Sequence, residues 1–242
     1  ARGRRPRAAR GGQVESGAMR HAPTLAVLHG LRLGSVVPAD ALARRTGLAI
    51  DEVLSQLAAA RECGWVRHHE GRLPGWSLTR SGRHEGERLL AEELDAAGAR
   101  DVVVEVHSEF AQLNVEVLAV CTDWQVVRLV GVETPNDHRD DAYDVAVLER
   151  LATVHARARP LVRRLGQALE RFRGYDPRLE RALERTMGGA TEWFTRPTID
   201  SYHTVWFELH EDLLATLGLR RADDMTGRAG RVRLDEPHQE HA

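Results

Sequence analysis

The 242-residue sequence contains no lysine, because all 34 of its basic side chains are arginine. Together with the frequent alanine and glycine, this bias indicates a GC-rich coding sequence, so the number of arginines alone says little about function. The 36 acidic residues bring the formal net charge to −2, which gives no overall charge that points to nucleic acid or membranes. Only a local excess of arginine is informative.

Cysteine and long apolar runs are also scarce. The two cysteines, Cys63 and Cys121, have no paired spacing, which excludes a disulfide framework and a cysteine-based zinc motif. No apolar run approaches the roughly 20 residues needed to span a bilayer. The arginine-rich start of the chain is not followed by the apolar core of a signal peptide. We therefore expect a cytoplasmic protein without a membrane partner.

Sequence motifs of catalysis are missing as well. The chain has no glycine-rich phosphate loop, no nucleophile elbow and no histidine-glutamate zinc-protease motif. Glu208, His210 and Glu211 resemble fragments of di-iron carboxylate bundles, but the paired Glu-x-x-His motifs of those sites are absent. The sequence therefore predicts a protein that is not an enzyme, with no catalytic residues, no cofactor and no bound metal.

The composition is that of a globular protein, with 42% hydrophobic and 29% charged residues. A chain of this length has room for two domains, because single cores usually belong to units of roughly 100 to 150 residues. The small residues of "DAAGAR", residues 95–100, separate short elements before them from long helical patterns after them. We place the domain boundary there.

Short helices are expected in the first part. Apolar spacing predicts one helix before Gly34, a second that begins at Pro38, and a third over "IDEVLSQLAAARECG". Gly47 suits the tight turn between the second and third helices, since glycine adopts positive φ at low cost. The third helix is expected to bury Val53, Leu54 and Leu57. Helix, glycine turn and helix form a helix-turn-helix.

A β-hairpin is expected next. "WVRHH" and "GWSLT" are typical of two strands around the turn "EGRLP", and "SGRHEGERLLAEEL" predicts a helix capped by Ser81. Trp65 and Trp76 are expected to pack across the strands rather than to stack on bases. A hairpin that follows a helix-turn-helix makes a winged helix.

Four segments, "ALARRTGL", "VLSQL", "GWV" and "SLTRSGR", resemble the MarR-type winged-helix transcription regulators, over about residues 22–96. In that family the helix after the turn enters the major groove and the wing contacts the DNA backbone or minor groove. The resemblance therefore implies base contacts from Ser55 and Gln56 and phosphate contacts from Arg44 and Arg45. On the wing it implies phosphate contacts from Arg67, His68, His69, Arg72 and Arg80.

The charge distribution keeps an alternative open. Residues 21–95 carry nine arginines against ten acids, and Asp51 and Glu52 at the start of the expected recognition helix repel phosphate. The stretch 61–83 has a local excess, with five arginines against Glu62 and Glu70. The alternative is a winged-helix adaptor that binds a protein and never contacts DNA.

The second part predicts an all-α bundle of long helices. The first helix ends at a loop, "ETPNDHRDD", and the second contains Pro160, which should kink or divide it. Asp176 should cap the third helix. The last helix is "DSYHTVWFELHEDLLATLG". In the first helix, apolar residues recur in steps of four and three, as in a bundle or coiled-coil seam. They are Val106, Phe110, Leu113, Val117, Val120, Trp124 and Val127.

Unusual side chains in this bundle suggest a pocket for an organic effector. Its expected residues are Asp123, Trp124, Tyr202, His203, Trp206, Phe207 and His210. A metal site would instead join His203 and His210 to Asp123, His138 or His155, but two histidines seven residues apart lie roughly 10 Å from each other. The third possibility is that they are bundle histidines bonded to their neighbours or at a subunit interface.

The sequence as a whole predicts a mainly α protein with four parts. They are a disordered basic tail (1–20), a winged helix-turn-helix with a small antiparallel wing (21–97), an all-α helical bundle (98–219) and a second disordered tail (220–242). The expected function is a DNA-binding transcriptional regulator. Its expected partners are double-stranded DNA, a second copy in a homodimer through the bundle, and a small-molecule effector.

Overall fold

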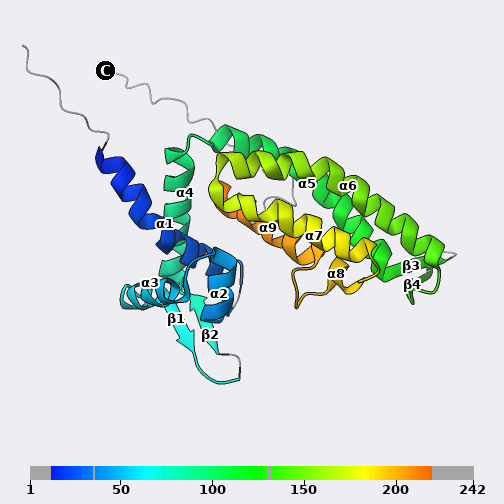
Figure 1. Cartoon of the computed structure of the whole chain (residues 1–242), viewed down its shortest axis with the longest axis horizontal. Coiled ribbons are helices and arrows are strands. Elements are labelled where there is room, and N and C mark those ends of the chain that lie inside the picture. The colour runs from blue at the N-terminus through cyan, green and yellow to red at the C-terminus, as the bar shows by residue number, and fades with distance from the viewer. Residues whose placement is uncertain (1–11, 35, 73, 130–131, 220–242) are drawn as a thin grey trace, which may run out of the picture. The chain divides into compact units, whose positions relative to one another are not determined.

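The chain is mainly helical and contains two small antiparallel sheets, which confirms the expected mainly α class (Figure 1). The structure is a computed structural model that describes residues 12–34, 36–72, 74–129 and 132–219. Two compact units make up the chain, Ala1–Gly98 (unit 1) and Ala99–Ala242 (unit 2). The boundary between them, after Gly98, lies within the "DAAGAR" segment, residues 95–100.

The described residues of unit 1 form four helices and one hairpin. Its elements are α1 (Gly12–Arg32), α2 (Ala39–Thr46), α3 (Ile50–Glu62), β1 (Val66–His69), β2 (Gly75–Leu78) and α4 (Arg80–Ala96). The structure places residues 12–20, which the sequence assigned to a tail, in α1, whereas 1–11 and 220–242 lie outside the described residues. Helix α1 contacts each of the other three helices of the unit.

The core of unit 1 consists of one apolar stripe from each helix. Leu54, which we expected to be buried, is instead 46% exposed. The buried positions of α3 are spaced by four and three residues, and Leu54 lies one residue beyond that stripe. The main buried side chains are Leu25, Leu28, Leu31, Leu42, Val53, Leu57, Leu89, Leu90 and Leu94.

The hairpin of unit 1 pairs β1 with β2 antiparallel, with His68 opposite Trp76. A second backbone pair joins Trp76 to Val37, in the connection between α1 and α2, through two N–H···O bonds of 2.8 Å. The hairpin is therefore fixed to the helices by main-chain hydrogen bonds.

A close approach of backbones joins the hairpin to α4. Thr79 caps α4 by accepting a hydrogen bond from the Gly82 amide at 3.1 Å, so the expected cap at Ser81 lies two residues too late. The Thr79 amide donates to the Trp65 carbonyl at 2.9 Å. A Cβ atom on Gly82 would lie 1.9 Å from that same carbonyl oxygen, so only glycine fits there.

Unit 2 is built on a hairpin of two long helices, α5 (Arg100–Gln125) and α6 (Asp141–Ala168), which lie side by side (Figure 1). They are joined by a second β-hairpin, β3 (Val126–Leu129) with β4 (Val132–Pro135). The expected apolar seam of α5 is buried from Val106 to Trp124, but its last member, Val127, belongs to β3. Pro160 does not divide α6.

The remaining elements of unit 2 are a short 3-10 segment η1 (Glu170–Gly174), α7 (Tyr175–Met187), α8 (Glu192–Thr195) and α9 (Tyr202–Leu217). Helix α7 begins at Tyr175, so Asp176 lies inside the helix rather than at its cap. Ser201 caps α9 by accepting a hydrogen bond from the Thr204 amide. Helix α9 contacts α5, α7 and α8.

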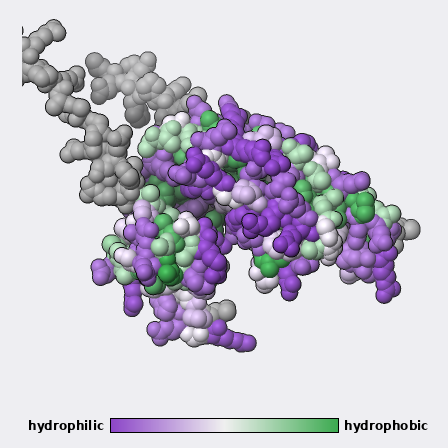
Figure 2. All heavy atoms as spheres, viewed as in Figure 1, coloured by the Kyte–Doolittle hydropathy of each residue, from purple (hydrophilic) through white to green (hydrophobic). Residues whose placement is uncertain are grey.

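The described helices give no candidate for a membrane span, since none combines the necessary length with low charge. Hydrophilic residues cover much of the visible face in Figure 2, with hydrophobic residues scattered among them.

Candidate nucleic-acid interface and the expected effector pocket

The hairpin of unit 1 carries two exposed arginines, Arg67 and Arg72. Its two histidines are engaged in packing and hydrogen bonding. The His68 ring lies 4.7 Å from the Trp76 ring, and His69 Nε2 is hydrogen-bonded to Ser77 Oγ at 2.7 Å. Trp76 therefore packs across the strands, as expected. His68 stays exposed beside it, and Arg67 and Arg72 have no side-chain partner in the described structure.

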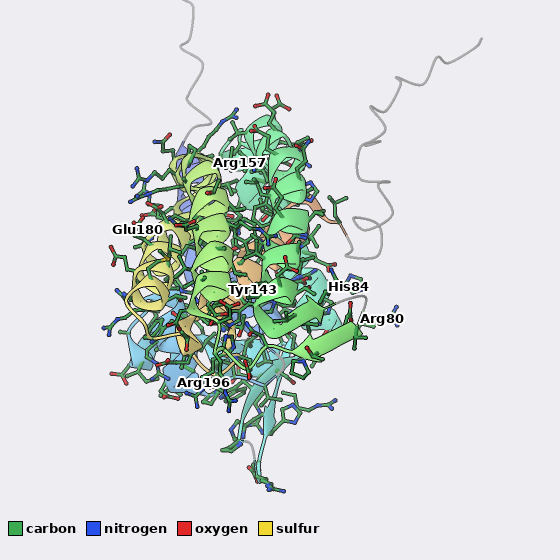
Figure 3. All side chains as sticks on the ribbon, turned by 90° about the vertical axis from the view of Figure 1, so that its right-hand side faces the viewer. Arg80, His84, Tyr143, Arg157, Glu180 and Arg196 are labelled. Atoms are coloured by element: carbon green, nitrogen blue, oxygen red, sulfur yellow. The ribbon has the colours of Figure 1, made fainter. Side chains whose placement is uncertain are left out.

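Exposed basic side chains continue onto the first turns of α4. Three basic side chains share one face of this helix, because Arg83 and His84 lie three and four residues after Arg80. Figure 3 shows Arg80 and His84 on the same side of the molecule. Our sequence prediction named Arg80 but missed the other two, although the same spacing would have identified them.

Unpaired arginines are concentrated in one stretch of unit 1. Within the described part of the chain, the five arginines between residues 61 and 83 form no side-chain hydrogen bond or salt bridge, and all five are exposed. They are Arg61, Arg67, Arg72, Arg80 and Arg83. Guanidinium groups that have no internal partner are available to bind an anion.

The arginines of α2, in contrast, have internal partners. Arg44 Nη1 donates to Asp40 Oδ2 at 2.8 Å, and this bond lowers the pKa of Asp40. Arg45 Nη1 donates to the Gly30 carbonyl at 3.0 Å. Their proposed phosphate contacts remain predictions, but both would have to compete with these bonds.

Helix α3 presents little that suits a DNA groove. Gln56 is half-buried, and its Oε1 accepts a hydrogen bond of 2.8 Å from the Thr24 hydroxyl. Ser55 is exposed, but so are Asp51 and Glu52 at the start of the helix. The structure therefore favours contacts by the hairpin over base reading by this helix.

The aromatic residues of the expected effector pocket pack directly against core residues. Trp206 stacks on Phe110 with ring centroids 4.5 Å apart, and its Nε1 donates to Asn114 Oδ1 at 3.0 Å. Tyr202 stacks on Trp206, and the His210 ring lies 5.5 Å from Phe110. Three of the seven expected residues are thus brought together, in a filled core.

Two of the other expected pocket residues, Asp123 and Trp124, have partners outside that group. Trp124 packs on His138 and on Phe194, with ring centroids 4.5 and 5.2 Å away. Asp123 Oδ2 forms a salt bridge of 2.6 Å with Arg150. Phe207 is 42% exposed, and partial burial lowers the pKa of His203.

Two shallow depressions on unit 2 involve none of these seven residues. One, of about 240 Å³, lies between α5 and α6 and is lined by Glu116, Ala119, Val120, Arg150, Thr153 and Val154. The other, of about 280 Å³, lies beside Gly166 and Asp176. The effector pocket remains a prediction that no cavity described here supports.

A metal site has no counterpart among the described side chains, where no group of three or more His, Cys, Asp or Glu residues could hold an ion. Two of the candidate histidines instead have protein partners. His138 Nδ1 lies 2.9 Å from Asp144 Oδ2. His155 is buried, its Nδ1 lies 3.4 Å from the Tyr202 hydroxyl, and burial lowers its pKa.

A buried charged network in unit 2 was not predicted. Asp212 is 2% exposed, forms a salt bridge with Arg171, and accepts a hydrogen bond of 3.0 Å from the Tyr175 hydroxyl. Burial, then the nearby carboxylate, raises the pKa of Tyr175. One turn earlier, Glu208 accepts a bond of 2.7 Å from Arg178. These residues stabilise the packing of α9 and are far apart in sequence, so periodicity could not reveal them.

Comparison with known families corrects one of our predictions. Residues 21–84, about a quarter of the chain, match the family model of the HemN C-terminal domain. The MarR-type family assignment over residues 22–96 is therefore wrong, and transcription regulation, which we inferred with it, conflicts with this match. Helix caps, a glycine turn and a hairpin are local signals that unrelated families share. No curated protein and no solved structure matches the chain.

Proposed function

We propose that unit 1 is a winged helix that binds double-stranded DNA through its hairpin, the wing, and the first turns of α4. One observation carries the proposal: the five exposed arginines between residues 61 and 83 have no side-chain partner within the described part of the chain. The succession of α2, α3, β1, β2 and α4 supports the winged-helix arrangement.

The chemistry of this surface suits a phosphate backbone. Guanidinium groups donate paired hydrogen bonds to phosphate oxygens, and they remain charged at every physiological pH. Arg80 and Arg83 lie in the first turns of α4, where the helix dipole also favours an anion. Contacts of this kind carry no sequence information, so we expect binding that depends weakly on sequence.

Binding should be measured by fluorescence anisotropy with a labelled duplex over a range of salt concentrations. The double variant Arg67→Ala/Arg72→Ala should weaken binding and reduce the slope of log K against log salt by about 1.8, since each lost phosphate contact removes about 0.9. Arg181→Ala is the matched control, because Arg181 is exposed on α7 and has no described partner. An equal slope in both variants would refute DNA binding by the wing.

A second measurement distinguishes DNA contacts made by the wing from DNA contacts made by α3. Asp51 and Glu52 repel phosphate if α3 faces the duplex, so Asp51→Asn/Glu52→Gln should then raise affinity strongly. If only the wing and α4 make contact, as we propose, the affinity should change less than twofold. A large gain would instead support base reading by Ser55 and Gln56.

A protein-binding adaptor is the second candidate, and the surface of α3 favours it. Ile50 and Leu54 are 43% and 46% exposed and lie one turn apart, with Ala58 one turn further. Exposed apolar side chains beside acids fit a protein partner better than a phosphate backbone. If the intact protein binds no duplex even at low salt, DNA binding is excluded and the protein-binding adaptor remains.

A further inference from the structure

Helix α5 has a second apolar stripe on its exposed side, separate from the buried seam. Its members follow one another in steps of four and three residues, the spacing of coiled-coil contact positions. Val115 and Leu118 are 68% and 48% exposed, and Val104 is 40% exposed. We call this set the outer stripe: Val104, Ser108, Ala111, Val115, Leu118 and Thr122.

The outer stripe carries no charge over its whole length. The hydroxyl of Thr122, the last member, donates to the Leu118 carbonyl at 2.8 Å, so its proton already has an acceptor within the helix. Nearby acids of α5 are paired with arginines of α6, in salt bridges that join the two helices. These are Glu105 with Arg164, Glu116 with Arg157, and Asp123 with Arg150.

We propose that the outer stripe packs against the outer stripe of a second copy of this chain, with the two α5 helices antiparallel about a two-fold axis near position 113. The stripe is symmetric about that position. The axis would place Ser108 opposite Leu118, Ala111 opposite Val115, and Val104 opposite Thr122. In the first two of these pairs a small side chain meets a larger one, as close packing of two helices requires.

Charge decides between the two possible orientations. In a parallel pair, Asp101, which continues the outer stripe by one step and is exposed, would face its own copy. In the antiparallel pair, it faces the exposed Gln125 instead, and Glu105 beside the stripe lies level with Cys121 rather than with another carboxylate. Opposed carboxylates at a contact are unfavourable, so the surface fits an antiparallel second copy.

The size of the stripe sets the expected strength. Eighteen residues separate Val104 from Thr122, which is about 27 Å of helix. One helix pair of that length buries less than the roughly 800 Å² per partner of a standard interface, so we expect a dissociation constant in the micromolar range. The dimer does not depend on DNA binding by unit 1, and either proposal can fail without the other.

Sedimentation analysis of the intact protein, over nanomolar to high micromolar concentrations, tests the association. We expect a monomer–dimer equilibrium that Val115→Glu weakens at least tenfold, because the new carboxylates would be buried opposite Ala111. Val132→Glu on β4 is the matched control, since Val132 is 60% exposed and lies outside the stripe. A monomer at every concentration, or a dimer that Val115→Glu leaves unchanged, would overturn the proposal.

Cysteine cross-linking tests the orientation. In a Cys63→Ser background, which removes the exposed natural thiol, Ala111→Cys and Val115→Cys chains should form a disulfide with each other when mixed. Each variant alone should form none, because like positions lie too far apart in the antiparallel pair. Cross-linking of each variant with itself, and no mixed disulfide between Ala111→Cys and Val115→Cys chains, would show a parallel pair and refute the model.

Discussion

Two regions of the molecule, residues 61–83 of unit 1 and the buried network of unit 2, use arginine differently. In unit 1, the arginines between residues 61 and 83 are exposed and have no side-chain partner in the described structure. In unit 2, several arginines join two elements, and Arg171 and Arg178 pair with the buried carboxylates Asp212 and Glu208. Arginine is the only cation that the chain uses, so composition could not distinguish the two situations. The paired arginines of the buried network contribute to stability, whereas the unpaired arginines of residues 61–83 are the ones to which we assign binding in our proposal.

The largest effect should come from breaking the buried pair of unit 2. Asp212→Ala leaves the Arg171 guanidinium without its carboxylate in a buried place, which should cost about 3–5 kcal/mol of unfolding free energy. Chemical denaturation followed by circular dichroism measures this loss. Asp137→Ala removes an exposed carboxylate near Arg139 and should cost less than about 0.5 kcal/mol. Equal losses in the two variants would contradict the contrast that we draw.

Packing rather than charge should dominate the stability of unit 1. Gly82→Ala forces a Cβ against the Trp65 carbonyl and should cost about 1–3 kcal/mol. Gly86→Ala, one turn later in the same helix, is the control, because its Cβ would have Leu28 Cβ at 3.7 Å as its nearest neighbour. There the helix propensity of alanine should stabilise the protein by up to about 1 kcal/mol. A neutral Gly82→Ala would show that the hairpin is not clamped to α4.

Acid should destabilise unit 2 through the buried His155 and the half-buried His203. Burial lowers the pKa of His155, despite Glu180 at 3.5 Å, and it lowers the pKa of His203. As the pH falls below about 6.5, the unfolded chain takes up protons that the folded state resists, so stability decreases. The melting temperature should therefore fall below that pH, and His155→Gln should reduce the fall. An unchanged pH profile in this variant would exclude His155 as a cause.

The smallest effect on stability should come from the unpaired arginines. Arg72→Ala removes no described contact, so the unfolding free energy should change by less than about 0.5 kcal/mol, whereas our proposal expects the same variant to weaken DNA binding. Denaturation of this variant beside the wild type provides the measurement. A loss above 1 kcal/mol, a value about twice the expected limit, would mean that the wing arginines belong to the folding network after all.

Helices were the most predictable part of the fold, because their signals are local. Gly47 ends α2 with a φ of 72°, and Ser201 and Gly218 bound α9, as glycine turns and caps indicate. The hairpin β3–β4 was missed because Val127 continues the apolar spacing of α5, so the helical pattern ran into the strand. Period alone cannot place that boundary.

The candidate site was predictable only where it depends on single exposed residues. Arg67, Arg72 and Arg80 follow from the wing prediction, and they are exposed in the structure. The engagement of Gln56 with Thr24 joins positions 32 residues apart, and no local pattern reports such a contact. The resemblance to MarR-type regulators proved wrong for the same reason. The four segments that carried it are local helix and turn signals, and they do not report which side chains come together on the surface.

The attachment of the wing by main-chain hydrogen bonds, from Trp76 to Val37 and from Thr79 to Trp65, has an evolutionary consequence. Every amino acid except proline supplies the same N–H and C=O groups, so mutation can replace the exposed side chains of the wing without removing these bonds. Descendants of this chain can therefore acquire new charges at the positions of Arg67 and Arg72 while the ribbon keeps its direction. The surface charge of this region can therefore change through few mutations and with little loss of stability.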